Sequence, residues 1–128
     1  MILGLGIDLI ETSRIQDSLD RFKDRFLNRV FLPGEIDYCQ AMKFPARHLA
    51  ARFAAKEAVS KAFGTGIGRS LGWKDIEVRR RETGEPYLVL HGKGAQMAGL
   101  RGMDGSLLSL THHETSAAAV VVLYSKTP

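Results

Sequence analysis

The segment from Ala46 to Gly68 constrains the fold most, because it has the composition of one long helix followed by a glycine-rich loop. No Gly or Pro interrupts residues 46–63, where Ala, Leu, Arg, Lys and Glu dominate, and all of these favour helices. Gly64 stands where a C-terminal cap is expected, and Gly66 follows in a loop open to unusual backbone angles. The segment therefore predicts a central helix that ends at Phe63.

The charged residues of this helix do not occupy a face of their own. At about 100° per residue, one large apolar side of the helix consists of Leu49, Phe53, Val59 and Phe63. A second side, lined by small side chains, consists of Ala51, Ala55, Ala58 and Ala62. Arg52 and Lys56 fall within the apolar side, while Glu57 and Lys61 lie beside it. Either Glu57 and Lys61 form a surface pair worth a few tenths of a kcal/mol, or the helix holds a charged ligand.

Residues 1–11 alternate as a strand in which Leu3, Leu5, Ile7 and Leu9 project to one face. Gly4, Gly6 and Asp8 project to the other face, so Asp8 stands where two glycines leave room for a neighbouring group. The Gly-Leu-Gly stretch lacks the third glycine of a dinucleotide fingerprint. Asp8 either accepts backbone hydrogen bonds at a strand end or binds a metal ion.

Thr12 and Ser13 are candidate N-caps for a helix that runs to about Phe26. Its apolar stripe, at helical spacing, consists of Ile15, Leu19, Phe22 and Phe26. Beside it Arg14, Arg21 and Arg25 form a row. The row is either a solvated face or a docking surface for an acidic helix, where it would affect encounter and orientation more than affinity.

The remaining chain predicts mainly strands. Residues 73–81 and 87–91 should pair across a turn, residues 93–101 form a weak helix, and residues 106–112 and 117–124 form a second hairpin. Leu108, Leu110 and His112 share a face, and a histidine in that position is more often structural than a ligand. The expected class is α+β, with a mostly antiparallel sheet packed against one long central helix in a single compact domain, residues 1–128.

Composition limits the kinds of partner that the protein is expected to bind. The 128 residues carry 18 basic and 14 acidic side chains, a net charge of +4, which favours an anionic partner without identifying it. A non-catalytic module that binds nucleic acid or an acidic protein is one alternative, although the interleaved acids argue against nucleic acid. The single Cys39 excludes an internal disulfide and a cysteine-based zinc site, which suits a cytoplasmic location. No apolar run is long enough for a membrane span.

Asp8 and Glu57 are carboxylates on two rigid elements, and hard oxygen ligands suit Mg²⁺ bound together with substrate phosphates. The side chains of Lys61, Arg52 and Lys56 could neutralise those phosphates, and Gly64 to Gly68 could offer backbone N–H groups. This set of residues predicts phosphoryl-type transfer that depends on positioning and charge neutralisation.

At these residues the chain resembles a known family. GIDLIE near the start, RFAAKEAVSKAFGTGIG in the middle and SLTHHE near the end are similar to segments of the holo-acyl-carrier-protein synthases, the small bacterial 4′-phosphopantetheinyl transferases. The resemblance implies transfer of 4′-phosphopantetheine from coenzyme A to a serine of apo-acyl carrier protein, with release of adenosine 3′,5′-bisphosphate. This reaction supports fatty acid biosynthesis.

The resemblance also implies roles for particular residues. Asp8 and Glu57 would bind Mg²⁺, Lys61 would contact the coenzyme A phosphates, and His112 would lie near the nucleotide end. Arg14 would meet the acidic carrier helix, with Arg21 as a second candidate. The resemblance further implies a homotrimer with coenzyme A bound between subunits, and neither nucleic acid nor membrane as a partner. The base that accepts the serine proton, a carboxylate or a metal-polarised water, stays open.

Overall fold

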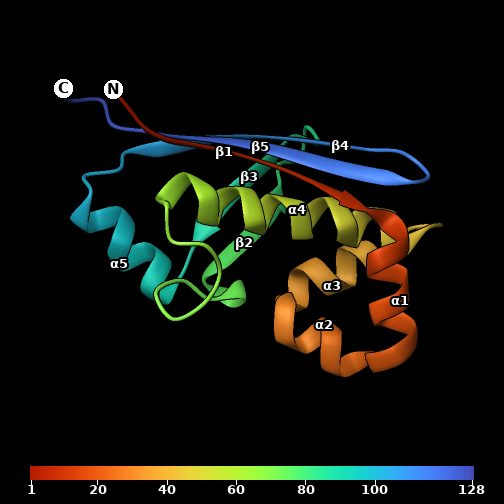
Figure 1. Cartoon of the computed structure of the whole chain (residues 1–128). Coiled ribbons are helices and arrows are strands. Elements are labelled where there is room, and N and C mark those ends of the chain that lie inside the picture. Colours follow the sequence, from red (N-terminus) through yellow and green to blue (C-terminus); the bar gives the residue numbers. More distant parts are fainter.

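The computed structural model describes all residues, 1–128 (Figure 1). Along the chain the elements are β1 (Ile2–Glu11), α1 (Thr12–Phe22), α2 (Asp24–Val30), α3 (Pro33–Gln40), α4 (Pro45–Phe63), a 3₁₀ turn (Trp73–Asp75), β2 (Ile76–Arg80), β3 (Pro86–Leu90), α5 (Gly92–Leu100), β4 (Gly105–His112) and β5 (Ser116–Tyr124). None of the helices is both long enough and apolar enough to traverse a bilayer.

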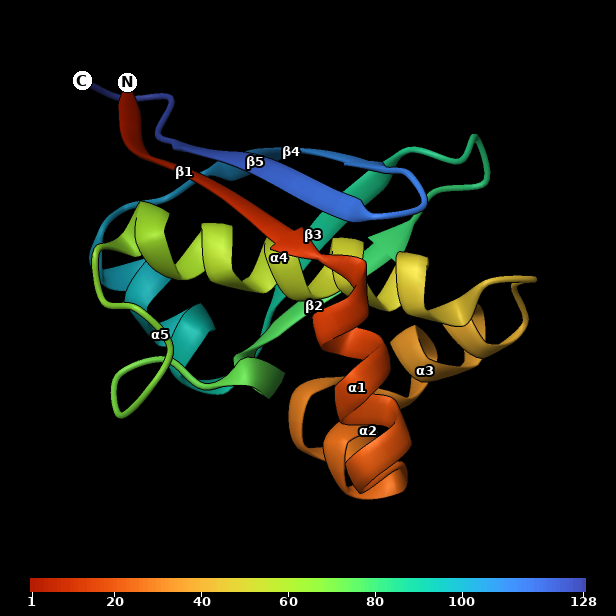
Figure 2. The same ribbon diagram turned by 45° about the vertical axis from the view of Figure 1, so that its right-hand side comes forward.

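The strands form two antiparallel sheets rather than the one sheet expected. The larger sheet has the order β1-β5-β4, and β2 pairs with β3 in a separate hairpin. The 19-residue α4 packs against β1 and β5, with α1 to α3 gathered near its N-terminal end and α5 near its C-terminal end (Figures 1 and 2). The α+β class is confirmed, and the strand periodicity that predicted it could not assign strands to sheets.

Strand β1 lies unusually close to α4 because two glycines face the helix. A Cβ atom built on Gly4 would lie 2.1 Å from the carbonyl oxygen of Ala62, and one built on Gly6 would lie 1.8 Å from that of Ala58. Ala58 and Ala62 belong to the side of the helix that is lined by small side chains, and they are buried. Small residues on both elements thus allow backbone-to-backbone contact. This contact sets the distance between Asp8 and α4.

The expectation of one continuous helix from Thr12 to about Phe26 is wrong. Lys23, with a φ of 47°, breaks the segment, so α1 ends at Phe22 and α2 begins at Asp24. The N-cap is Glu11, without a side-chain cap, rather than Thr12 or Ser13. Because the helix ends at Phe22, Arg25 belongs to α2 and not to the helix that carries Arg14 and Arg21.

Other boundaries follow the sequence closely. Gly64 caps α4 in the left-handed conformation, with a φ of 80°, as its position predicted. The strand expected from Trp73 begins only at Ile76, because residues 73–75 form a 3₁₀ turn. Ile76 and Val78 are buried as expected, and the β4–β5 hairpin is confirmed.

Candidate active site

Asp8, Glu57 and Lys61 lie around the contact between β1 and α4. The ammonium of Lys61 donates to Asp8 Oδ1 at 3.0 Å and to the carbonyl oxygen of Ile7 at 3.1 Å. The Lys61 side chain is 53% exposed and that of Asp8 is 17% exposed, so the pair sits at the edge of the packed layer. The structure therefore joins residues that are 53 positions apart in the sequence.

Glu57 is held in a setting that disfavours its charge. Burial, followed by the nearby carboxylate of Asp8, raises the pKa of Glu57 above its usual value, while Lys61 and Arg14 act in the opposite direction. The charge of Asp8 thus acts on Glu57, and a divalent cation bound by both carboxylates would remove their repulsion. No group of three or more His, Cys, Asp or Glu side chains is arranged for a metal ion. The donor set suits Mg²⁺, which keeps several waters and uses few protein carboxylates.

A groove of about 420 Å³ lies between α1, α2 and α4. Its lining includes three arginines and four aromatic rings, namely Arg14, Arg25, Arg29, Phe22, Phe26, Phe53 and Trp73. The guanidinium of Arg14 lies 5.6 Å from the centre of the Phe53 ring, and its charge acts on Glu57, so the groove adjoins the carboxylates. Arg21 is exposed but does not line this groove.

Lys56 is not placed to neutralise phosphates at this site, which corrects the expectation for it, whereas the role expected for Arg52 stays a prediction. Lys56 is fully buried and donates to Glu35 Oε1 at 2.8 Å, to the Trp73 carbonyl oxygen at 3.0 Å and to the Ile76 carbonyl oxygen. Burial lowers the pKa of Lys56, an effect that Glu35 partly offsets. Arg52 is 1% exposed and stacks on the ring of Tyr38 at 4.3 Å. The ion pair with Glu35 thus ties Lys56 into the core.

The backbone N–H groups of Gly64 and Gly66 donate hydrogen bonds within the chain. Gly64 donates to the carbonyl oxygen of Lys61 at 3.0 Å, and Gly66 donates to that of Ser60 at 3.3 Å. These hydrogen bonds satisfy carbonyl groups at the end of α4. Both glycines adopt the positive φ predicted for them. That they bind cofactor phosphates stays a prediction.

His112 lies on the same face of the larger sheet as Asp8 but two strands away. Asp8 pairs with Ala119 and Ala119 with Leu110, whereas His112 pairs with Ala117. Two strand spacings and two residues separate Asp8 from His112, roughly 12 Å. His112 instead contacts His48, with ring centres 4.7 Å apart. It belongs to a separate group of basic side chains.

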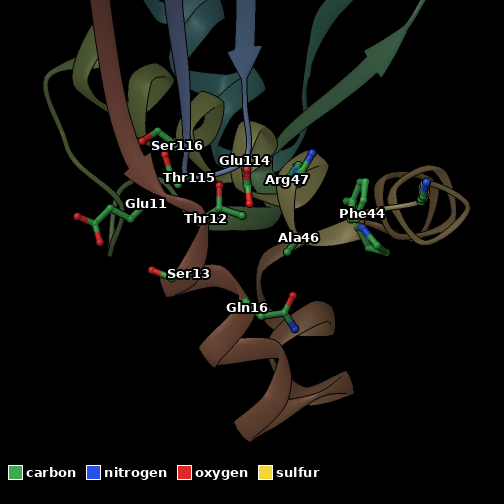
Figure 3. Close-up of a pocket in the computed structure, with 12 residues that line it drawn as sticks. Glu11, Thr12, Ser13, Gln16, Phe44, Ala46, Arg47, Glu114, Thr115 and Ser116 are labelled. Carbon is green, nitrogen blue, oxygen red and sulfur yellow. The ribbon is translucent and has the colours of Figure 1, made fainter.

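A second cavity, larger than the groove at about 790 Å³, lies at the other end of β1 from the chain's N-terminus (Figure 3). It is lined by residues of both charges, with Arg47 on the α4 side and Glu114 at the β4–β5 turn. Asp8, Glu57 and Lys61 do not line it. This cavity is therefore separate from the carboxylates of Asp8 and Glu57.

Several site residues had no usable sequence signal. Arg29, Phe53 and Trp73 come from three separate segments and meet only in the groove. Glu35, which accepts hydrogen bonds from Leu32 N, Val78 N and Lys56, appears in the sequence as an ordinary turn residue. Only for His48 was there a hint, because it stands at the start of the predicted helix within its most basic stretch.

Comparison with known proteins shows which family the chain resembles. Residues 4–120 match the model of the 4′-phosphopantetheinyl transferase superfamily. The chain is 50% identical over 123 residues to the holo-[acyl-carrier-protein] synthase of Koribacter versatilis, covering 96% of this chain and 98% of that one. The crystal structure of the Neisseria meningitidis synthase superposes with a TM-score of 0.90 at 30% identity, covering 98% and 100%. The crystal structure of the Bacillus anthracis synthase in complex with CoA (3′,5′-ADP) superposes with a TM-score of 0.81 at 38% identity, covering 98% of this chain and 99% of that one.

Proposed function

We propose a function from the premise that this chain belongs to the 4′-phosphopantetheinyl transferase superfamily. The chain is a transferase that moves 4′-phosphopantetheine from coenzyme A to a serine of apo-acyl carrier protein, with release of adenosine 3′,5′-bisphosphate. We further propose that it acts in the cytoplasm, where its product would serve fatty acid biosynthesis.

The observation that supports this function most directly is the meeting of Asp8, Glu57 and Lys61. Asp8 and Glu57 would hold Mg²⁺, as their mutual repulsion and oxygen donors indicate. When bound, the ion would neutralise negative charge on the pyrophosphate of coenzyme A. Lys61, already oriented by Asp8 and the Ile7 carbonyl, would donate to an oxygen of the transferred phosphoryl group.

The transfer itself forms a bond between the serine oxygen and phosphorus. The bond from phosphorus to the bridging oxygen of the pyrophosphate breaks, and its electron pair leaves on adenosine 3′,5′-bisphosphate. The serine proton goes to a carboxylate or to water. The protein contributes mainly by aligning the reacting groups and by offsetting charge, as in phosphoryl transfer generally.

The direct test is to mix the protein with apo-acyl carrier protein, coenzyme A and Mg²⁺ and to weigh the carrier by mass spectrometry. We expect the carrier to gain one phosphopantetheine arm, and we expect EDTA to abolish the gain until Mg²⁺ is restored in excess. A non-catalytic binding module would leave the mass unchanged. If the carrier still gains the phosphopantetheine arm in EDTA, the protein is a transferase that does not need the metal ion.

The raised pKa of Glu57 predicts how activity depends on pH. Only the ionised carboxylate binds a cation, so activity should fall as the pH is lowered, and the fall should begin above the usual pKa of a glutamate, 4.5. Protons and Mg²⁺ compete for this group, so a higher Mg²⁺ concentration should move the acid limb to lower pH. Measurement of kcat/KM against pH at two Mg²⁺ concentrations checks this, and superimposable acid limbs would contradict it.

We propose that the groove beside Arg14 receives the carrier protein. Three arginines offer positive charge to an acidic helix, and the aromatic rings offer a surface for its apolar side chains. The groove adjoins Glu57, so a serine at the end of a helix seated there would be close to the reacting phosphorus. Arg14 is the stronger of the two arginines expected from the sequence, because Arg21 lies outside the groove.

Arg14→Glu is expected to raise the KM for apo-carrier protein about tenfold or more at low salt, with less effect on the KM for coenzyme A. Charge reversal replaces attraction by repulsion at the rim, and added salt should reduce the difference. Steady-state kinetics at two ionic strengths measure this. Lys126→Glu, which reverses an exposed charge near the C-terminus, is the matched control. Equal losses in the two variants would contradict a specific role for Arg14.

The outer face of the larger sheet is apolar and open. Leu5, Ile7 and Leu9 on β1 and Leu107 on β4 are 64% to 72% exposed. Leu5 lies opposite Val122, which in turn lies opposite Leu107, so the exposed side chains are neighbours across three strands. Exposed apolar patches of this kind mark interfaces between proteins. We propose that this face joins the subunits of a homotrimer and that coenzyme A binds between them.

Leu5→Lys should convert the oligomer to monomers, because it places a charge within this apolar face. Light scattering after size-exclusion chromatography gives the mass, and activity should fall with it if the site needs two subunits. Leu100→Lys is the control, since Leu100 is 90% exposed at the end of α5 and away from this sheet. A Leu5→Lys protein of unchanged mass would place the interface elsewhere.

A further inference from the structure

The ammonium of Lys56 joins three elements inside the protein. Lys56 lies on α4, and its side chain is completely buried. Its Nζ donates to Glu35 Oε1 of α3 at 2.8 Å, to the carbonyl oxygen of Trp73 at 3.0 Å and to that of Ile76. An ammonium has three N–H groups, so every donor of Lys56 is used. The side chain therefore connects α4 to α3 and to the segment that leads into β2.

The hydrogen bond to Trp73 matters because little else ties this part of the chain to α4. Directly after the helix, Thr65 N and Gly66 N both donate to the carbonyl oxygen of Ser60. From residue 67 to residue 75, the bond from Lys56 is the only hydrogen bond to α4. The position of the Trp73 backbone relative to α4 therefore depends on Lys56.

The ring of Trp73 is held by the same helix. It lies against the ring of Phe53, with 4.6 Å between ring centres, and Phe53 stands one turn before Glu57 on α4. Trp73 and Phe53 both line the groove that carries Arg14, and we call these two rings the groove wall. Because Lys56 directly precedes Glu57, one stretch of α4 holds both the groove wall and the carboxylate.

Stability alone does not explain a buried ion pair at this place. Removing the charges of Lys56 and Glu35 from water costs free energy, and apolar residues of similar size often stabilise a core as well or better. A buried ammonium adds direction, since each of its three N–H groups must point at an acceptor. Two of the three acceptors here are the backbone carbonyl groups of Trp73 and Ile76, so the groove wall is the part whose direction is fixed.

We propose that Lys56 is a positioning residue for carrier recognition, which acts through Trp73 to hold the groove wall at a set distance from Glu57. The inference rests on the proposed function, because it takes the groove as the seat of the carrier protein. The serine of a seated carrier must meet the phosphorus held at Glu57, so the two places need a fixed separation. Lys56 itself is buried and touches neither substrate.

The test uses Lys56→Met together with Glu35→Gln, which removes both charges, leaves no buried ion alone and keeps the approximate size of the two side chains. Without the ammonium, the Trp73 backbone loses its hydrogen bond to α4. We expect the KM for apo-carrier protein to rise about tenfold, the size of one lost anchor at an interface. The affinity for coenzyme A, measured by calorimetry, should stay unchanged. A wild-type KM for the carrier, or an equal loss for coenzyme A, would overturn the proposal.

Fluorescence observes the groove wall directly, because Trp73 is the only tryptophan of the chain. In the variant with both substitutions, the emission should move to longer wavelength and acrylamide should quench it more strongly, since the indole is freer to meet water. A wild-type spectrum with wild-type quenching would contradict a role that acts through Trp73, whatever the KM.

Glu35→Gln alone is the matched control, because it breaks the ion pair but keeps the hydrogen bond from Lys56 to Trp73. This variant should be less stable than the variant with both substitutions, since it leaves one buried charge without its partner. It should nevertheless keep the wild-type KM for the carrier. If KM instead follows stability across the two variants, Lys56 serves the fold alone and the proposal is wrong.

A double-mutant cycle tests whether Lys56 acts through Trp73. In a Trp73→Ala background, the substitutions at Lys56 and Glu35 should raise the carrier KM no further, and additive effects would refute the proposal. If Lys56→Met with Glu35→Gln does not fold, Lys56→Gln with Glu35→Gln is measured instead, and wild-type values there refute it equally. If the wild type transfers nothing, the proposed function fails separately, and calorimetry with apo-carrier protein replaces KM as the test of Lys56.

Discussion

Replacing Glu57 with glutamine is expected to reduce phosphopantetheine transfer by about 100-fold or more, because a neutral amide cannot help to hold the cation that offsets phosphate charge. The amide has nearly the same size as the carboxylate, so substrate access does not change. Mass spectrometry of the carrier over time measures the rate. Full activity of this variant with Mg²⁺ would show that Glu57 does not bind the metal.

Loss of activity in Glu57→Gln should come without loss of stability. Because burial and Asp8 raise the pKa of Glu57, its ionised form is less favourable in the folded chain than in the unfolded chain. Near pH 7 glutamine removes that cost, so the thermal midpoint should stay the same or rise. Glu82→Gln, an exposed substitution in the β2–β3 turn, is the control and should leave both rate and midpoint unchanged. A large drop in midpoint would mean that lost structure explains the lost activity.

Replacing Gly6 with alanine should destabilise the protein by about 3 kcal/mol or more, a large part of a typical folding free energy. The new Cβ would lie 1.8 Å from the carbonyl oxygen and 2.7 Å from the carbonyl carbon of Ala58. Both atoms belong to the backbone of α4, which cannot rotate away as a side chain can. Strand β1 would have to lift from the helix, and Asp8 would move away from Glu57 with it.

Gly99→Ala in α5 is the matched control for Gly6→Ala. A Cβ at Gly99 meets no atom within 4 Å, and alanine favours a helix over glycine by about 1 kcal/mol. This variant should be as stable as the wild type or more stable. Urea unfolding of both variants measures the difference. Gly6→Ala with wild-type stability would mean that β1 does not need to approach α4 so closely.

The helix from residue 45 to 63 could be predicted because its signals are local. Good helix formers fill it, and a glycine stands where its chain must turn left-handed. The strands were predictable for a similar reason, since residues 105–124 alternate or run apolar and enclose a turn. The break at Lys23 was not, because neither Gly nor Pro marks it and the apolar spacing continues through it.

For the site, the place of a charged residue in the sequence pattern was more informative than its residue type. Asp8, Glu57 and Lys61 were singled out because charges stood among small and apolar residues, and the structure brings them together. Arg52 and Lys56 showed the same pattern, yet they are buried against Tyr38 and Glu35. A buried charge looks the same in a sequence whether its partner is a ligand or another side chain.

The sequence by itself determined the elements that depend on neighbouring residues: the long helix, its glycine cap, the hairpins, and the glycine-cleared strand that carries Asp8. Only the tertiary structure decided which charges meet. It joined Lys61 to Asp8, enclosed Lys56 with Glu35, and gathered His48, His112 and three arginines without an acid among their ion pairs. The physical reason is that backbone propensities act over a few residues, whereas the energy of a charge depends on groups that the fold brings close from distant parts of the chain.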